Sequence, residues 1–341
     1  MIFCGDFVYP FHQTYEFSID GPDEFLQAHK VINFECSLEG TCNNETNAPI
    51  PLISSPYSVD ILSQLNCKVV CLANNHTFDY EPNLDDLFRT FNNKSILPVG
   101  AGKNLSEAAE YVQYENFIIM NFGWDVIGCK KARKSRSGCN PVNYEHVLTE
   151  FKLAKNKNPL KKIVVVFHWG YEFEIYPMPA HRELCRVLSS LGAHAIICHH
   201  AHVILGCEYF GNTPVFYGLG NFFMPKFNFS GYVLDYPVIA KTGLAVDVFS
   251  AKLPRCYFVT INESNALKVH DSISVDELIT VTKSEFLGLS NKDYIDFFKN
   301  NRIKTKGLPV YEAIDDSVFV KDYFVYLRQI FIDTLVKLKL K

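Results

Sequence analysis

The chain has 341 residues, of which 48% are hydrophobic and 21% are charged, and its formal net charge is −4. This composition is typical of a soluble globular protein, and the length allows one large core or two smaller ones. A mildly acidic chain gives no reason to expect nucleic acid or an anionic membrane surface as a partner.

The cysteines and the first residues indicate a cytoplasmic protein. The chain has 11 cysteines and no C-x-x-C pair, and Cys71 and Cys198 lie inside apolar runs, as small buried hydrophobic residues do. Such thiols suit a reducing compartment better than a disulfide framework does. The opening stretch, MIFCGDFVYPF, lacks the basic and apolar regions of a signal peptide. No window reaches the roughly 20 apolar residues that a bilayer span needs, so we expect no membrane-spanning segment.

In chain order, short apolar runs alternate with segments of helical periodicity. Apolar residues recur at helical spacing over 83–93 and over 180–192, where Gly192 is a stop signal. Apolar runs that end in polar residues predict buried strands at 30–36, 67–74, 117–123, 162–170 and 194–200. This alternation favours an α/β architecture.

The last third of the chain has a different pattern. The pattern over residues 214–275 predicts successive strands without helices between them. These strands form a second sheet or complete the first. From residue 276 onward the pattern is helical and amphipathic. We therefore expect one domain over residues 1–275 and a C-terminal helical extension over 276–341. This extension covers the site, mediates dimerisation or only caps the domain, and the sequence leaves these alternatives open.

A basic loop interrupts the otherwise mildly acidic chain. Within residues 129–143, seven consecutive positions carry Lys130, Lys131, Arg133, Lys134 and Arg136. Such charge runs are usually solvated, so one interpretation is a surface loop without a specific ligand. The other is a lid that binds a phosphate or a polyanion, because the loop follows a predicted strand, where α/β folds place binding loops. On this interpretation Lys131, Arg133 and Arg136 contact the substrate.

Polar side chains follow nearly every predicted strand. They are carboxylates, amides and imidazoles, at Asp6, Asn33, Glu35, Asn74, Asn75, His76, Asp79, His168, Glu172, His200, His202 and Asn221. Each alone could belong to a turn or cap, but burying so many polar groups without partners costs free energy. Carboxylate, imidazole and amide donors together suit Mn²⁺, Fe or Zn²⁺.

The histidine-rich stretch IICHHAHVILG, residues 196–206, follows the last of these strands. On extended backbone, His200 and His202 point to the same side, and His199 points to the other. An H-x-H pair of this kind can offer two imidazoles to one metal ion, and a hydrogen-bonded surface pair is the alternative.

Seven ordered motifs resemble a known family. GDF, NFE, ANNHTFDYEPN, VGAGKN, FHWGYE, CHHAHVILG and YGLGNFF occur in this order over about residues 1–250. They are similar to motifs of the bacterial capsule-synthesis, poly-γ-glutamate CapA family, a branch of the calcineurin-like metallophosphoesterase superfamily. This resemblance implies a four-layer α/β/β/α sandwich with a metal site between the sheet edges.

The resemblance also implies roles for the strand-end residues. One metal position would use Asp6, Glu35 and His202, and the other would use Glu35, Asn75, His168 and His200, with Glu35 shared. His76 would protonate the leaving oxygen, Asp79 would orient His76, and Glu172 and Asn221 would contact the substrate. The superfamily's first motif is D-x-H, but here the third residue is Val8. The first position therefore lacks one histidine.

Three functions follow as expectations. The first is a hydrolase with one or two divalent ions (Mn, Fe or Zn) that acts on a phosphorylated or anionic intermediate of capsule or surface-polysaccharide biosynthesis. The alternative is a factor for synthesis or export of a poly-γ-glutamate-type polymer, by amide chemistry or as a non-catalytic partner. A member with a degenerate metal site is the third. The expected partner is an anionic small molecule or polymer, and the sequence is compatible with a homo-oligomer.

Overall fold

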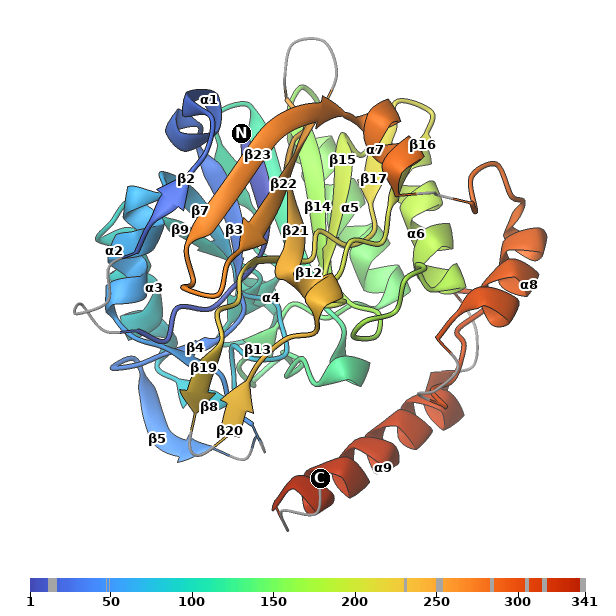
Figure 1. The fold of residues 1–341 in the computed structure, drawn as a ribbon. Coiled ribbons are helices and arrows are strands. Elements are labelled where there is room, and N and C mark those ends of the chain that lie inside the picture. Colours follow the sequence, from blue (N-terminus) through green and yellow to red (C-terminus); the bar gives the residue numbers. More distant parts are fainter. Residues whose placement is uncertain are drawn as a thin grey trace.

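A computed structural model of the protein describes residues 1–11, 17–46, 48, 50–229, 232–249, 254–282, 285–303, 307–314 and 318–337. Two β-sheets lie face to face in its centre, and helices cover their outer faces (Figure 1). This is the four-layer α/β/β/α arrangement that the family resemblance implies.

The first sheet combines strands from both ends of the chain. Its order is β2 (Ile19–Asp20), β23 (Leu267–Ser274), β22 (Arg255–Ile261), β21 (Thr242–Asp247), β1 (Ile2–Phe7), β3 (Lys30–Phe34), β7 (Cys67–Cys71) and β9 (Leu97–Val99), and β18 (Asn221–Phe223) also pairs with β1. β1, β3, β7 and β9 run parallel, whereas β21 pairs antiparallel with β1. The predicted strands of the 214–275 region therefore mainly complete the first sheet.

The second sheet carries the other half of the buried strands. Its order is β11 (Val112–Tyr114), β12 (Phe117–Gly123), β14 (Lys162–His168), β15 (Ala195–His199), β17 (Thr213–Phe216) and β16 (Cys207–Phe210). β12, β14, β15 and β17 are parallel. The strands predicted at 30–36, 67–74, 117–123, 162–170 and 194–200 are thus confirmed as β3, β7, β12, β14 and β15.

Helices cover the outer face of each sheet. On the first sheet these are α1 (Asp23–Gln27), α2 (Tyr57–Gln64) and α3 (Leu84–Asn92), and on the second α5 (Tyr144–Lys157) and α6 (Pro179–Ser190). The predicted helices at 83–93 and 180–192 are therefore confirmed. Asn83 caps α3 by accepting the backbone N–H groups of Asp85 and Asp86, and Leu87 and Phe91 pack inward from the next turns.

Short elements shape the edge of the sandwich. They are α4 (Leu105–Ala108), the 3₁₀ helices η1 (Asp125–Ile127) and η2 (Val238–Lys241), and the strand pairs β4–β6 (Ser37–Leu38, Ile53–Ser54), β5–β8 (Cys42–Thr46, Tyr80–Pro82), β10–β13 (Ala101–Gly102, Gly138–Cys139) and β19–β20 (Phe227–Phe229, Tyr232–Leu234).

Alternation along the strands separates three hydrophobic clusters. Val31 and Val69 of the first sheet meet Val164 and Ile197 of the second in the cluster between the sheets. Their neighbours in sequence face the helices instead, as β-strand geometry requires. The residues that continue the inward-facing series at the carboxyl ends of the strands therefore point into the gap between the two sheets.

The expected C-terminal extension is helical. It contains α7 (Val275–Val281), α8 (Asn291–Asn301) and α9 (Val318–Lys337). The hydroxyl of Tyr294 donates to Pro177 O at 2.6 Å, Tyr171 donates to Pro309 O at 3.1 Å, and the Ala180 N–H donates to Tyr311 O at 3.0 Å. These bonds connect the extension to the segment between β14 and α6 and to the first turn of α6.

The final helix, α9, projects beyond the sandwich (Figure 1, red) and leaves Phe324 and Phe331 more than half exposed. Within the described part of the chain, no helix combines the length and apolar character that crossing a membrane requires.

Candidate metal centre

Asp6 reaches the gap between the sheets because β1 contains a bulge. Cys4 pairs with Ile32 of β3, but the next pair joins Asp6 to Asn33, so Gly5 is the extra residue. A bulge reverses the alternation, and Asp6 therefore shares the inward face with Asn33. The Asp6 carboxylate is fully buried, and its Oδ1 accepts a hydrogen bond from Asn33 Nδ2 at 2.7 Å.

The loop after β7 supplies an amide and an imidazole. Asn74 is buried, and its Oδ1 accepts from the backbone N–H groups of His76 and Thr77, which fixes the loop. Asn75 Oδ1 lies 2.7 Å from His168 Nε2. His76 Nδ1 lies 2.6 Å from Asp79 Oδ2, which also accepts the Leu52 N–H at 2.7 Å. The expected contact between Asp79 and His76 is thus present.

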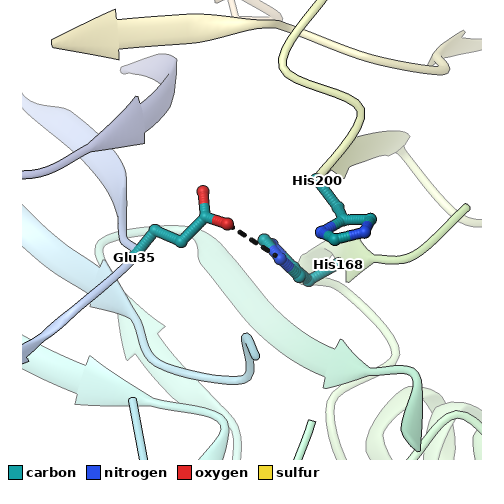
Figure 2. A group of neighbouring side chains, drawn as sticks. All are labelled: Glu35, His168 and His200. Atoms are coloured by element: carbon teal, nitrogen blue, oxygen red, sulfur yellow. Dashed lines mark ion pairs between the residues drawn. The ribbon is translucent and has the colours of Figure 1, made fainter. Parts of the chain in front are cut away.

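His168 is the last residue of β14 and continues the inward-facing series of Val164 and Val166. It is completely buried. Its Nε2 lies 3.4 Å from Glu35 Oε1, and its Nδ1 lies 3.2 Å from Asn33 Nδ2. Figure 2 shows Glu35 approaching from the opposite side to His168 and His200.

The histidine-rich stretch differs from the prediction. β15 ends at His199, so His200 and His202 do not lie on extended backbone, and both have positive φ angles of 90° and 58°. Non-glycine residues in this region store strain and are concentrated at functional sites. His199 itself follows Ala195 and Ile197 on the inward face, and its Nδ1 lies 3.1 Å from Asp6 Oδ1. His199 therefore contacts Asp6, although it belongs to neither group of ligand atoms.

Two groups of ligand atoms converge, and Glu35 belongs to both. In each group the atoms lie within 4.8 Å of one another: Glu35, His168 and His200 form one, and Asp6, Glu35 and His202 form the other. Neither oxygen of Glu35 has a hydrogen-bond partner among the described residues, and Asp6 Oδ2 and His200 Nδ1 also lack one. Buried polar atoms without partners are costly, and carboxylates and imidazoles are metal donors. The residues therefore fit a divalent metal ion.

The pKa values of these buried groups depend strongly on the charges of their neighbours. Burial and the nearby Asp6 carboxylate raise the pKa of Glu35 to about 8. Burial opposes protonation of His202, but Glu35 and Asp6 outweigh it and raise the pKa of His202 to about 10. Burial lowers the pKa of His168 and of His200 well below the usual range.

The pKa values of Asp6 and His76 shift in the direction that favours the charged form of each side chain. Although burial opposes ionisation, contacts with His199 and His202 hold the pKa of Asp6 well below its usual value. For His76, Asp79 outweighs the effect of burial and raises the pKa.

Val8, which stands where the D-x-H motif has its histidine, is buried in the outer cluster of the first sheet. It faces away from the centre. The group of Asp6, Glu35 and His202 thus has no donor from this position, in agreement with the sequence.

The five residues expected to contact substrate lie in different surroundings. Lys131 pairs with Asp125 at 3.3 Å, and Arg133 and Arg136 are exposed on either side of a tight turn. Glu172 is exposed, and its charge contributes to the raised pKa of His202. Asn221 is buried against His202.

Two cavities differ in their relation to the centre. One of about 400 Å³ is lined by Asn221, Tyr236 and Lys241, and the ring of Tyr236 lies 5.0 Å from that of His202. Another of about 750 Å³, lined by Lys155 and other basic residues, is larger but lies at the amino ends of β14 and β15. The buried polar cluster, not cavity size, identifies the site.

Three residues without a predicted role also contact the centre: Asn33 and Asn74, which the sequence places among the polar residues at strand ends, and His199. Asn33 and His199 had a detectable signal, because each is in phase with inward-facing valine or isoleucine residues of its own strand. Asn74 follows β7, but its contacts with Asn33 Oδ1 and Phe34 O of β3 could not be predicted from the pattern of its own loop.

Comparisons with known proteins agree with this geometry. The chain is 32% identical over 197 residues to "PGA biosynthesis protein CapA" of Bacillus subtilis (strain 168), covering 56% of this chain and 51% of that protein. It is 29% identical over 181 residues to "Capsule biosynthesis protein CapA" of Bacillus anthracis, covering 51% and 44%. The chain thus spans about half the length of these curated relatives. Residues 13–226 match the family described as "Bacterial capsule synthesis protein PGA_cap", so the chain belongs to this capsule-synthesis family, which has the metallophosphoesterase fold.

Proposed function

We propose that the protein is a metal-dependent hydrolase that cleaves a phosphoester in an anionic intermediate of capsule biosynthesis. The observation that carries this proposal is the position of Glu35, which belongs to both groups of ligand atoms and has no hydrogen-bond partner for either oxygen. A carboxylate shared by two metal positions is the arrangement used for displacement at phosphorus.

The proposed ligands are Asp6, Glu35 and His202 at one position and Glu35, Asn75, His168 and His200 at the other. Divalent ions of Mn, Fe or Zn would suit these donors, and when bound they supply charge neutralisation and increase the acidity of water. Asn75 Oδ1 already lies 2.7 Å from His168 Nε2, so only a small movement brings both to a common ion.

His76 is proposed to protonate the leaving oxygen. Because Asp79 holds Nδ1 at 2.6 Å, Nε2 is the nitrogen that remains for the substrate. The exposed Arg133 and Arg136, with Lys131 beside them, would bind anionic groups of the substrate. Glu172 is exposed and its charge acts on His200 and His202, so it would contact the substrate beside the centre.

The test is hydrolysis of aryl phosphates by protein loaded with Mn²⁺. The His76→Ala variant should retain its metal content and lose about 100-fold or more in turnover, since a general acid contributes rate and not metal affinity. His29→Ala removes a half-exposed histidine that contacts Tyr114 and should leave turnover unchanged. Metal-loaded protein that is inert towards phosphomonoesters, diesters and pyrophosphates would rule the proposal out.

The names of the relatives favour a second candidate. Both are biosynthesis proteins, one of them for PGA. The protein would then assist synthesis or export of poly-γ-glutamate or a similar polymer, by amide chemistry or by binding alone. Salt-sensitive binding of poly-γ-glutamate that Arg133→Glu and Arg136→Glu weaken, together with absence of phosphatase activity, would support this candidate over the first.

A further inference from the structure

Asn221 lies directly behind His202 in the candidate metal centre. It is the first residue of β18, opposite Asp6 of β1, and its side chain is only 5% exposed. Asn221 Oδ1 lies 2.8 Å from His202 Nδ1, and Asn221 Nδ2 donates to Ala240 O at 3.0 Å. The buried amide is therefore engaged at both ends, which leaves little of it to contact a substrate.

The orientation of this amide follows from its partners. A backbone carbonyl such as Ala240 O can only accept a hydrogen bond, so the atom facing it has to be the amide nitrogen. The atom facing His202 is then Oδ1, which also can only accept. His202 Nδ1 must consequently carry a hydrogen and donate it to Asn221.

This hydrogen bond decides which nitrogen of His202 is available to a metal ion. With Nδ1 protonated, the lone pair of the neutral ring is on Nε2, which lies 3.8 Å from Glu35 Oε1. We propose that Asn221 is a positioning residue that selects this tautomer and fixes the ring of His202 for metal binding. The proposal rests on the metal site of the proposed function and assigns Asn221 a different role from substrate contact.

Two glycines allow the neighbouring strands to pack closely against the backbone beside Asn221. A Cβ atom at Gly5 would lie 2.0 Å from Gly220 O, and one at Gly243 would lie 2.0 Å from Asn221 O. Only glycine at both positions allows β1 and β21 to approach this segment so closely. Asn221 is thus placed by the sheet itself.

Precise placement matters because the backbone of His202 is not part of a strand. His202 has a φ angle of 58° in the loop after β15. The hydrogen bond from its ring to a residue of the sheet restrains the side chain where regular structure does not. Partners of this kind orient metal-binding histidines, and losing one typically costs about 10- to 100-fold in metal affinity.

The chain offers a matched control at Asn140. This residue is 2% exposed, its Oδ1 lies 2.7 Å from His146 Nε2, and its Nδ2 donates to Asn121 O at 3.0 Å. Asn140 therefore has the same pair of contacts as Asn221, but its histidine is not one of the proposed ligands.

The experiment compares Asn221→Leu with Asn140→Leu by titrating metal-free protein with Mn²⁺ and with Zn²⁺. Asn221→Leu should weaken metal binding about 10- to 100-fold, whereas Asn140→Leu should bind as the wild type does. The melting temperatures of both metal-free variants should fall by similar amounts. Asn221→Asp, which keeps an acceptor facing His202, should recover most of the affinity.

A spectroscopic measurement reports the tautomer directly. In Co²⁺-loaded wild type, the Nδ1 proton of His202 should give a shifted, slowly exchanging NMR signal that Asn140→Leu retains and Asn221→Leu loses. Equal metal affinity in Asn221→Leu and wild type, or an equal loss in Asn140→Leu, would overturn the inference. Wild type that binds neither ion would overturn the metal centre as well. Protein that binds metal but hydrolyses no phosphoester would overturn only the proposed function.

Discussion

Two of the buried clusters of charged side chains among the described residues differ in how their carboxylates are paired. Behind the second sheet, Arg182 donates from Nε and Nη2 to the two oxygens of Glu208 at 2.7 and 2.9 Å, and Tyr217 donates to Glu208 Oε1 at 2.5 Å. In the candidate metal centre, Glu35 is equally buried, but neither of its oxygens has a hydrogen-bond partner among the described residues.

The difference separates a cluster paired within the fold from one that fits a metal ion. Glu208 is neutralised by a side chain of the same protein, so its burial is balanced within the fold. Glu35 and Asp6 are surrounded by histidines that are themselves metal donors, so this cluster fits an added cation. Burial of charge alone therefore does not identify a site, whereas convergence of buried donor atoms without partners indicates one.

The largest effect on stability is expected from breaking the paired cluster. Arg182→Met should lower the free energy of unfolding by about 3–5 kcal/mol, because it leaves Glu208 charged and buried without a partner. The double variant Arg182→Met/Glu208→Gln should recover much of this loss and still offers Tyr217 an acceptor. Urea unfolding measures both, and a loss below about 1 kcal/mol in the single variant would contradict the assignment.

In the candidate metal centre, by contrast, removing the charge of the buried carboxylate should not destabilise the metal-free protein. Metal at about 1,000 times its dissociation constant should stabilise the wild type by about 4 kcal/mol. Glu35→Gln should abolish this stabilisation, because it removes the shared ligand, while the metal-free variant should be at least as stable as the metal-free wild type. Thermal melts with and without chelator test this. Metal-free Glu35→Gln that melts well below metal-free wild type would place Glu35 with Glu208 as a structural residue.

His181 provides a third kind of buried titratable group, one that remains neutral. It stacks on Trp169 at 4.1 Å, and burial lowers its pKa to about 3. The unfolded chain takes up a proton below about pH 6.5 and the folded one does not, so stability falls as pH falls. Between pH 7 and 5 the loss due to His181 should be about 2 kcal/mol.

His181→Phe keeps a ring beside Trp169 and should remove this part of the pH dependence. The measurement is the change in unfolding free energy between pH 7 and 5 in variant and wild type, so contributions of other groups cancel. Identical pH dependence in both proteins would show that His181 is accessible to protons in the folded state.

The smallest effect is expected for an exposed ion pair. Lys94 Nζ lies 2.6 Å from Asp60 Oδ1, but both side chains are more than a third exposed. Lys94→Ala should change the free energy of unfolding by about 1 kcal/mol or less, because solvent screens such pairs. A loss as large as that of Arg182→Met would show that short distance, and not burial, determines the value of ion pairs here.

The layers of the fold could be predicted from the sequence because they depend on local patterns. The apolar run at 117–123 coincides with β12, and the helical spacing at 83–93 coincides with α3. The pairing of β21 with β1 could not be predicted in the same way, since it joins residues far apart in the chain, such as Ile2 and Asp247. Nothing in the local pattern of either strand identifies its partner.

The sequence predicts which residues belong to the candidate site better than it predicts how these residues are arranged. Glu35 and His168 continue the inward face of their strands, so their convergence follows from alternation. Asp6 does so only because of the bulge at Gly5, which local sequence does not show. His200 and His202 reach the centre through positive φ angles and not through the extended backbone that the H-x-H spacing suggests.

The hydrogen bonds of Tyr171, Tyr294 and Tyr311 have a practical consequence for anyone shortening this protein. The segment that follows His168 is bonded from outside by the C-terminal extension at Pro177 O, at the Ala180 N–H and through Tyr171 to Pro309 O. A protein that stops after β23 would lose these partners, and Trp124 would lose its ring contact with Tyr311. Expression trials should therefore retain the chain at least through Tyr311, even when the sandwich alone is wanted.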